Sequence, residues 1–260
     1  MIEAENITNL SGKTAVVIGG TSGLGRSIAL ALARSGADVV ATGRRESLLM
    51  DVAAEIEGLG RKTVRKTVNV SSRTSIDSLR DSVMLEMDGV DVLVNAAGRT
   101  ARKPTSEVTE SEWNEILDIN LHGMLRACQS FYELLSRSAN GRIINIASLA
   151  SFVAFHEVAA YGASKAAVLA LTRSLGSEWA KDGINVNAIV PGVFPTELNA
   201  ALLNGTERGR EILMRTPMKR FGEAEEVTGA AVFLASNAAS FITGQSIAVD
   251  GGYLASGVNS

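Results

Sequence analysis

The stretch TAVVIGGTSGLGRSIALALARSG, Thr14 to Gly36, decides the fold. It begins with TAVVIG, a β-branched apolar run of the kind that forms a buried strand. The glycine-rich residues GGTSGLG follow, and a segment with helical periodicity then ends at Gly36. A buried strand, a glycine-rich turn and an amphipathic helix in this order predict the first unit of a dinucleotide-binding sheet.

The alternation of strand-like and helical segments continues along the whole chain. The further strand-like runs are ADVVATG, RKTVNV, VDVLVNAAG, GRIINIAS, INVNAIVPG and QSIAVDGG. Helical patterns separate most of them, including one from about Ser47 to Leu59. This rhythm predicts an α/β fold, a single Rossmann-type doubly wound sheet of seven parallel strands with helices on both faces. The four prolines are scattered and no low-complexity tract interrupts the chain, so we expect one catalytic domain over residues 1–260.

Composition and charge exclude several classes of protein. A formal net charge of −3 argues against a nucleic-acid binder, and the basic run Arg61 to Lys66 is interpreted as the solvated approach to a strand. The first ten residues lack the apolar core of a secretory signal. No apolar run approaches the ~18 residues of a membrane span. We therefore expect no nucleic-acid partner and no membrane association.

Cysteine and histidine usage point in the same direction. The single cysteine, Cys128, excludes an internal disulfide and fits a reducing cytoplasm, which is the expected location. His122 and His156 stand apart from each other and from any cluster of ligands. The sequence therefore predicts no catalytic metal.

The glycine-rich turn predicts a phosphate site. Glycines at 19, 23 and 25 let the backbone turn tightly and approach a pyrophosphate, which then lies at the helix N-terminus. A tight turn without a ligand is the alternative. The cofactor-binding residues predicted here are Gly19, Thr21, Ser22, Gly23, Leu24 and Gly25.

The end of the second strand indicates which dinucleotide is bound. NAD sites usually have an acidic residue there for the adenosine ribose 2′-OH. This chain has TGRRE, with Gly43 at that place and then Arg44 and Arg45. The missing carboxylate removes repulsion toward a 2′-phosphate, and a guanidinium binds phosphate with two N–H groups. We therefore predict NADP(H), although two arginines in a surface loop could also face only water.

A tyrosine and a lysine stand four residues apart in a segment of small residues, AAYGASKAAV. On a helix, Tyr161 and Lys165 are neighbours, and an ammonium lowers the pKa of a nearby phenol. Lowering that pKa from about 10 toward 7 takes roughly 4 kcal/mol, more than one exposed lysine provides. We expect the charge of an oxidised nicotinamide and partial burial to contribute as well. The pair predicts proton transfer at Tyr161 as hydride leaves or arrives, with Ser148, at the end of RIINIAS, bonding the reacting oxygen.

With these motifs, nearly the whole chain resembles the short-chain dehydrogenase/reductase family. GGTSGLG resembles its cofactor loop, with Ile18 where a threonine is usual, and NAAG after the fourth strand resembles its N-N-A-G. Asn120 in LDINLHG matches an asparagine that, in the family, holds a water in a proton relay behind the lysine. A polar residue at a helix kink is the other interpretation. The resemblance implies a catalytic tetrad of Asn120, Ser148, Tyr161 and Lys165.

The same resemblance implies further cofactor contacts and an oligomer. NV at Asn69 and Val70 takes the place of the D-V beside the adenine, and PGVFPT resembles the P-G-x-x-x-T whose backbone contacts the nicotinamide carboxamide. The family also implies a homotetramer in which two long helices, about Thr109 to Ser136 and Ala159 to Lys181, pair across an interface. The cofactor residues implied are Asn69, Val70, Asn95, Ala96, Ala97, Gly98, Tyr161, Lys165, Pro191, Gly192, Val193 and Thr196.

The substrate is the least determined part. The segment of about 197–221 covers the substrate in this family, and RTPMKRFG with PGVFPTELN resembles gluconate 5-dehydrogenases and related sugar-acid reductases. The 3-oxoacyl carrier-protein reductases are the alternative. A sugar acid needs a cation for its carboxylate, so Arg102 and His156 are candidate substrate residues together with Ser148, although Arg102 and His156 could equally face solvent. A non-catalytic NADP(H)-binding regulator is a third interpretation, but the intact tetrad argues against it.

Overall fold

A six-stranded parallel sheet forms the centre of the protein in the computed structural model, which describes residues 7–195, 203 and 205–257. The strand order is β2-β1-β3-β4-β5-β6. Short apolar runs form these strands because both faces of a parallel sheet are covered. The strands are β1 (Thr14–Ile18), β2 (Asp38–Thr42), β3 (Val92–Asn95), β4 (Gly141–Ile146), β5 (Ile184–Pro191) and β6 (Ser246–Val249).

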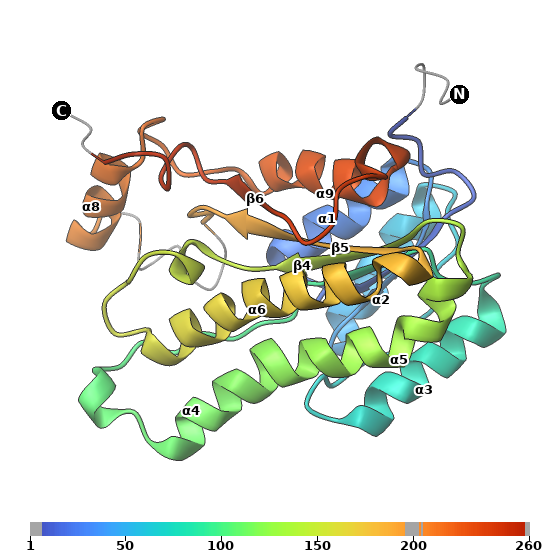
Figure 1. The fold of residues 1–260 in the computed structure, drawn as a ribbon, viewed down its shortest axis with the longest axis horizontal. Helices are drawn as coiled ribbons and strands as arrows, with labels where there is room; N and C mark the ends of the chain where they lie inside the picture. The colour runs from blue at the N-terminus through green and yellow to red at the C-terminus, as the bar shows by residue number, and fades with distance from the viewer. Residues whose placement is uncertain (1–6, 196–202, 204, 258–260) are drawn as a thin grey trace.

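Helices cover both faces of the sheet, each over its own hydrophobic core (Figure 1). Neighbouring strand residues alternate between the two cores, since Val16 packs with one and Val17 with the other. On one face lie α1 (Gly23–Arg34), α2 (Glu46–Gly58) and α9 (Thr228–Ala235). On the other lie α3 (Arg73–Glu86), α5 (Gly123–Arg137) and α6 (Ala159–Glu178). The remaining described α-helices are α4 (Glu110–Leu117) and α8 (Glu207–Arg215).

The predicted seventh strand is wrong: the segment RKTVNV is not a strand in the described chain. The chain there runs beside β2 but makes only isolated backbone bonds. One joins Val39 N to Lys62 O at 3.0 Å and another joins Val68 N to Gly43 O at 3.0 Å. Between them, the hydroxyl of Thr42 donates to the carbonyl of Lys66. A side chain therefore takes up a carbonyl that a regular ladder would pair with a backbone N–H.

The strand order reverses between β1 and β3, and this reversal opens a crevice at the carboxyl ends of the strands. In the sheet register Ile18 lies beside Asn95, and Asn95 beside Asn145. The loops that leave these strands therefore start next to one another. The arrowheads of β5 and β6 point toward the end of the sheet at which α6 begins (Figure 1). The candidate functional residues follow these strand ends or lie on α6.

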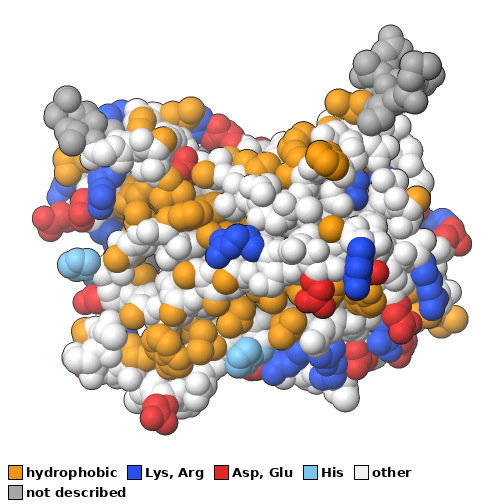
Figure 2. Space-filling view, viewed as in Figure 1, with side chains coloured by type: hydrophobic (Ala, Val, Ile, Leu, Met, Phe, Trp, Pro, Cys, Tyr) orange, Lys and Arg blue, Asp and Glu red, His pale blue; other side chains and the backbone are white. Residues whose placement is uncertain are grey.

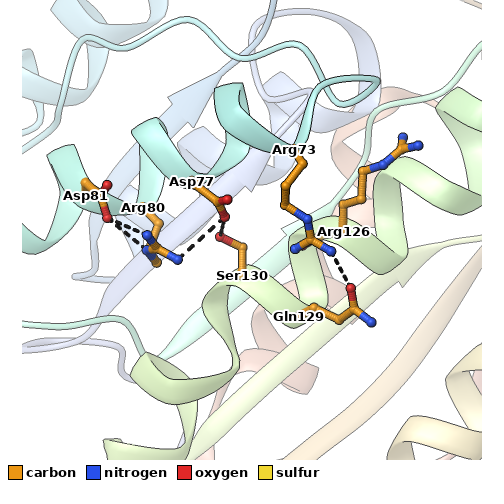
Figure 3. A network of polar contacts seen from close by, with 7 residues as sticks. All are labelled: Arg73, Asp77, Arg80, Asp81, Arg126, Gln129 and Ser130. Carbon is orange, nitrogen blue, oxygen red and sulfur yellow. Dashed lines mark hydrogen bonds and ion pairs between the residues drawn. The ribbon is translucent and has the colours of Figure 1, made fainter.

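Polar contacts fix α3 against α5 (Figure 3). Arg73 donates to the carbonyl of Arg126 at 3.0 Å, and Asp77 accepts a hydrogen bond from Ser130 at 2.7 Å. Arg126 in turn donates to the carbonyl of Val70 at 3.2 Å. This interface therefore sets the position of the loop at Val70, which the family resemblance predicts to lie beside the adenine.

Candidate active site

The glycine-rich loop after β1 has no room for a Cβ at Gly19, Gly20 or Gly25. Gly19 has a φ of +84°, and an added Cβ there would lie 2.4 Å from the backbone nitrogen of Ala97. At Gly25 an added Cβ would lie 2.1 Å from the carbonyl oxygen of Gly19. The loops after β1 and β3 therefore pack backbone against backbone, an approach that only glycine permits.

The N-terminus of α1 has backbone N–H groups available to an anion. No side chain caps the helix at Ser22, and the first turn contains no acidic residue. The Ser22 hydroxyl instead accepts a hydrogen bond from Arg45 at 2.8 Å. A helix end of this kind, beneath a glycine loop, fits the pyrophosphate of a dinucleotide.

The end of β2 fits a 2′-phosphate better than a ribose hydroxyl. An added Cβ at Gly43 would lie 2.6 Å from the hydroxyl oxygen of Thr21, so the carboxylate typical of NAD sites is both absent and crowded out. Arg44 is exposed, and its guanidinium has no ion pair among the described residues. Of the two predicted arginines, Arg44 is therefore the one available to a ligand.

The other predicted cofactor residues lie in different surroundings. Asn69 is exposed and its amide oxygen accepts from Ser71 N at 3.1 Å, while Val70 is buried. Asn95 is buried and donates to Asn145 at 2.9 Å, so its side chain is a link between β3 and β4. Ala96 N donates to the carbonyl of Ile18 at 2.8 Å, which holds the loops after β1 and β3 together.

Tyr161 and Lys165 lie one turn apart on α6, as the spacing predicts. The Lys165 ammonium is 5.8 Å from the centre of the Tyr161 ring and donates to the carbonyl of Ile146 at 2.7 Å. Lys165 is only 4% exposed, whereas the sequence argument treats it as an exposed lysine. Its burial lowers the pKa of its ammonium to about 8.

Ser148 shares a hydrogen bond with Tyr161. Burial raises the pKa of the Tyr161 phenol, and the hydrogen bond from Ser148 opposes this change. The expectation that burial helps to lower this pKa is therefore wrong, because a low-dielectric environment disfavours the charged phenolate. With its pKa raised, Tyr161 is a neutral phenol at neutral pH in the free protein.

Asn120 lies in a π-helical turn, Asp118–His122, that joins α4 to α5. It is fully buried, and its amide bonds both backbone groups of Arg99, at 2.8 Å to N and 2.9 Å to O. Its amide also donates to the hydroxyl of Ser164 at 3.0 Å. Asn120 thus stands at a helix irregularity and also ties the loop after β3 to α6. The water relay stays a prediction.

Ser164 is a polar residue of the site that the sequence argument missed. It lies beside Lys165 on α6, and its hydroxyl donates to the carbonyl of Tyr161 at 2.7 Å. The only sequence feature that indicates a place in the site is that Ser164 directly precedes Lys165. A serine inside a helix more often bonds its own helix, so this signal is weak.

We predict that Lys165→Met stabilises the protein at pH 7. The difference between a pKa of 10.5 and about 8 corresponds to roughly 3 kcal/mol of burial cost. The carbonyl of Ile146 loses a charged partner worth about 2 kcal/mol, which leaves a net gain of about 1 kcal/mol.

The gain depends on pH, because the unfolded state binds more protons than the folded state between pH 8 and 10.5. The wild-type free energy of unfolding therefore rises in that window, and the difference from Lys165→Met shrinks. Urea titrations at pH 7 and pH 9.5 measure both effects. A variant of equal or lower stability at pH 7 would contradict the assignment of an unfavourable buried charge.

The loop after β5 borders a cavity of about 350 Å³. An added Cβ at Gly192 would lie 2.6 Å from the Cα of Asp250, and the carbonyl of Val193 accepts from Gly222 N at 3.0 Å. Pro191 ends β5 and orients this loop. Thr196 lies outside the described residues, as does part of the predicted substrate-covering segment 197–221.

The predicted substrate residues lie in the loops after β3 and β4. Arg102 does not stand alone, since its Nε lies 2.5 Å from Glu157 Oε2. His156 is exposed in the same loop as Glu157. Within the described residues, His, Cys, Asp and Glu form no group of three or more that could hold a metal ion. None of the described helices is long and apolar enough to cross a membrane.

Comparisons with known proteins agree with this geometry. The family model described as enoyl-(acyl carrier protein) reductase, a model of short-chain dehydrogenases/reductases, matches residues 19–254. The 2-dehydro-3-deoxy-D-gluconate 5-dehydrogenase of Dickeya dadantii is 38% identical over 251 residues, which are 96% of this chain and 98% of that protein.

Two solved structures are similar over their full length. One, from Beutenbergia cavernae with bound NADP at low occupancy, is 44% identical with a TM-score of 0.91 and covers 96% of this chain and 100% of that chain. The other is the gluconate 5-dehydrogenase of Burkholderia cenocepacia in complex with NADP and tartrate. It is 33% identical with a TM-score of 0.92, and the match covers 98% of this chain and 100% of that chain.

The chain belongs to the short-chain dehydrogenase/reductase family. It is therefore an oxidoreductase that acts on a CH–OH group with a nicotinamide cofactor.

Proposed function

We propose that the protein transfers hydride between NADP(H) and a secondary alcohol or ketone of a small sugar acid, as a gluconate 5-dehydrogenase does. The observation that carries this proposal is the cluster of Ser148, Tyr161 and Lys165 at the carboxyl ends of the strands, next to a glycine-rich phosphate loop. The relatives named for gluconate and 2-dehydro-3-deoxygluconate supply the substrate class.

The cofactor is held by the loops after β1, β2, β3 and β5. The N–H groups at the start of α1 bind the pyrophosphate, and Arg44 binds the 2′-phosphate. Asn69 and Val70 border the adenine, and the backbone near Val193 borders the nicotinamide. NADP in the two solved relatives supports this choice of cofactor. When bound, NADP(H) supplies or takes up the hydride.

Proton transfer is the task of the chain's own residues. Tyr161 donates its phenolic proton to the carbonyl oxygen when the ketone is reduced, and it receives the proton back when the alcohol is oxidised. Ser148 bonds the same oxygen. A charged Lys165 stabilises the phenolate that Tyr161 becomes, and its bond to the carbonyl of Ile146 keeps the ammonium in place. Asn120 fixes Arg99 and Ser164 beside this group.

The sugar-acid proposal and the acyl-thioester alternative differ in a simple assay. We expect D-gluconate with NADP⁺ to give a higher kcat/KM than acetoacetyl thioester with NADPH, because the site offers Arg102 to a carboxylate. Initial rates with both pairs, under identical buffer conditions, measure the ratio. Rapid reduction of the thioester with no turnover of sugar acids would instead favour a 3-oxoacyl carrier-protein reductase.

A homotetramer in the cytoplasm completes the proposal. Hydrophobic side chains gather over α4, α5 and α6 in Figure 2. The exposed side of α6 carries Ala163, Ala166 and Ala170, which would let a second helix approach closely. A surface of this kind supports helix pairing between subunits, and light scattering would give the assembled mass. The buried Cys128 is compatible with a reducing compartment.

A further inference from the structure

Three basic side chains follow Gly98 in the loop after β3, and each is paired with a carboxylate of this chain. The pairs are Arg99–Glu115, Arg102–Glu157 and Lys103–Glu112. A substrate carboxylate that binds to this loop must therefore take the place of one of the chain's own carboxylates. The structure indicates which one is replaced.

Two of the three carboxylates are fixed in α4. Glu112 forms the capping box of that helix, where it accepts from Thr109 N at 2.8 Å in addition to Lys103 at 3.0 Å. Glu115 lies in the same helix and pairs with Arg99, whose backbone Asn120 binds. Displacing Glu112 would remove that helix cap, and Glu115 pairs with the side chain of Arg99 and not with Arg102, the predicted substrate residue.

Glu157 is held differently. It lies in the loop before α6, and among the described residues its carboxylate bonds Arg102 alone. The two side chains are 35% and 48% exposed, so each can reach water without a change of fold. The backbone of Glu157 has a φ of +67°, and its carbonyl accepts from Lys103 N at 2.8 Å. That backbone bond keeps the two loops together whatever the side chain does.

The Arg102–Glu157 pair joins the loop after β3 to the loop after β4, and both loops also contain residues next to the reacting groups. Glu157 lies four residues before Tyr161, in the loop that leads into the helix of Tyr161. Arg102 lies four residues after Gly98, where an added Cβ would be 3.6 Å from Lys165 Nζ. A substrate whose alcohol reaches Tyr161 therefore extends toward this pair.

We propose that Glu157 holds the place of the substrate carboxylate on Arg102 and is displaced when a sugar acid binds, an inference that rests on the proposed function. The acid exchanges one carboxylate for another, so Arg102 keeps its ion pair and Glu157 moves into water. A neutral polyol offers Arg102 no replacement and leaves the pair closed. Glu157 therefore weakens the binding of acids slightly and helps to exclude neutral analogues.

The test is the dissociation constant of D-gluconate for the protein–NADPH complex, followed by NADPH fluorescence, in which no turnover takes place. We expect Glu157→Gln to bind D-gluconate about two- to fivefold more tightly, the range that an exposed ion pair supports. Glu115→Gln removes the same charge from the neighbouring pair and is the matched control, with no change expected. Equal tightening in both variants would show that the loss of any nearby negative charge favours D-gluconate, and it would overturn the exchange. Unchanged or weaker binding in Glu157→Gln would also overturn it.

A second pair of variants isolates the role of Arg102. Arg102→Met weakens D-gluconate binding about tenfold or more, because a charge-assisted hydrogen bond is lost. Adding Glu157→Gln to Arg102→Met then has no further effect if the two residues act on one carboxylate. A gain in the double variant equal to that in Glu157→Gln alone would overturn the proposal.

Turnover, measured separately with NADP⁺, distinguishes this inference from the proposed function. Binding shifts as described without any oxidation of D-gluconate would reject the proposed activity and keep the exchange. Oxidation by a Glu157→Gln variant with wild-type binding would reject the exchange alone. No binding of D-gluconate by the wild-type complex would reject both.

Discussion

Tyr161→Phe is expected to lose about 10²- to 10⁴-fold in kcat while it keeps wild-type affinity for NADPH. The substitution removes one hydroxyl, the group that exchanges a proton with the reacting oxygen and shares a hydrogen bond with Ser148. The ring and its packing stay, so the cofactor loops are not disturbed. Steady-state rates and NADPH fluorescence measure the two quantities separately.

Tyr132→Phe is the matched control for this prediction. Tyr132 lies on α5, packs against Trp179 with ring centres 5.0 Å apart, and shares a hydrogen bond with Asp182. The same chemical change there should leave kcat within about twofold. A Tyr161→Phe variant that retained turnover would reject Tyr161 as the proton donor.

Arg44→Ala is expected to lower kcat/KM for NADP⁺ about 10- to 100-fold and to change that for NAD⁺ by less than threefold or so. The guanidinium has no ion pair among the described residues, so its removal costs binding only toward a 2′-phosphate. Rates with both cofactors at several concentrations give the two values. Arg34→Ala, an exposed arginine at the far end of α1, is the control with no expected effect. An equal loss with NADP⁺ and NAD⁺ would remove the basis for NADP(H) specificity.

Local spacing was enough to predict most of the fold. All six strands come from apolar runs that the sequence marks, and the spacing of the glycines identifies the turn between β1 and α1. The seventh strand could not be excluded in this way. Val64 and Val68 are buried as in a strand, yet the Thr42 hydroxyl takes a place that a ladder bond would fill. Whether the Lys66 carbonyl bonds a side chain or a backbone N–H depends on how the segment packs against β2, which the local sequence does not determine.

The candidate site was predictable where residues are close in sequence. Tyr161 and Lys165 meet because helical periodicity brings them together. The burial of Tyr161 and of Lys165 depends instead on the surrounding elements, and the sequence therefore gives the wrong sign for the effect of burial on the pKa of Tyr161. The ion pair of Arg102 with Glu157 joins two loops that are far apart in the chain, so no local sequence pattern predicts it.

The most direct test of the central claim uses D-gluconate that carries deuterium at C5, mixed with the protein and NADP⁺. We expect NADPH to form, to contain the deuterium when analysed by mass spectrometry, and to form far more slowly with Tyr161→Phe. NADPH without the label would contradict hydride transfer from C5, and no NADPH at all would contradict the oxidation of D-gluconate by NADP⁺ at this site.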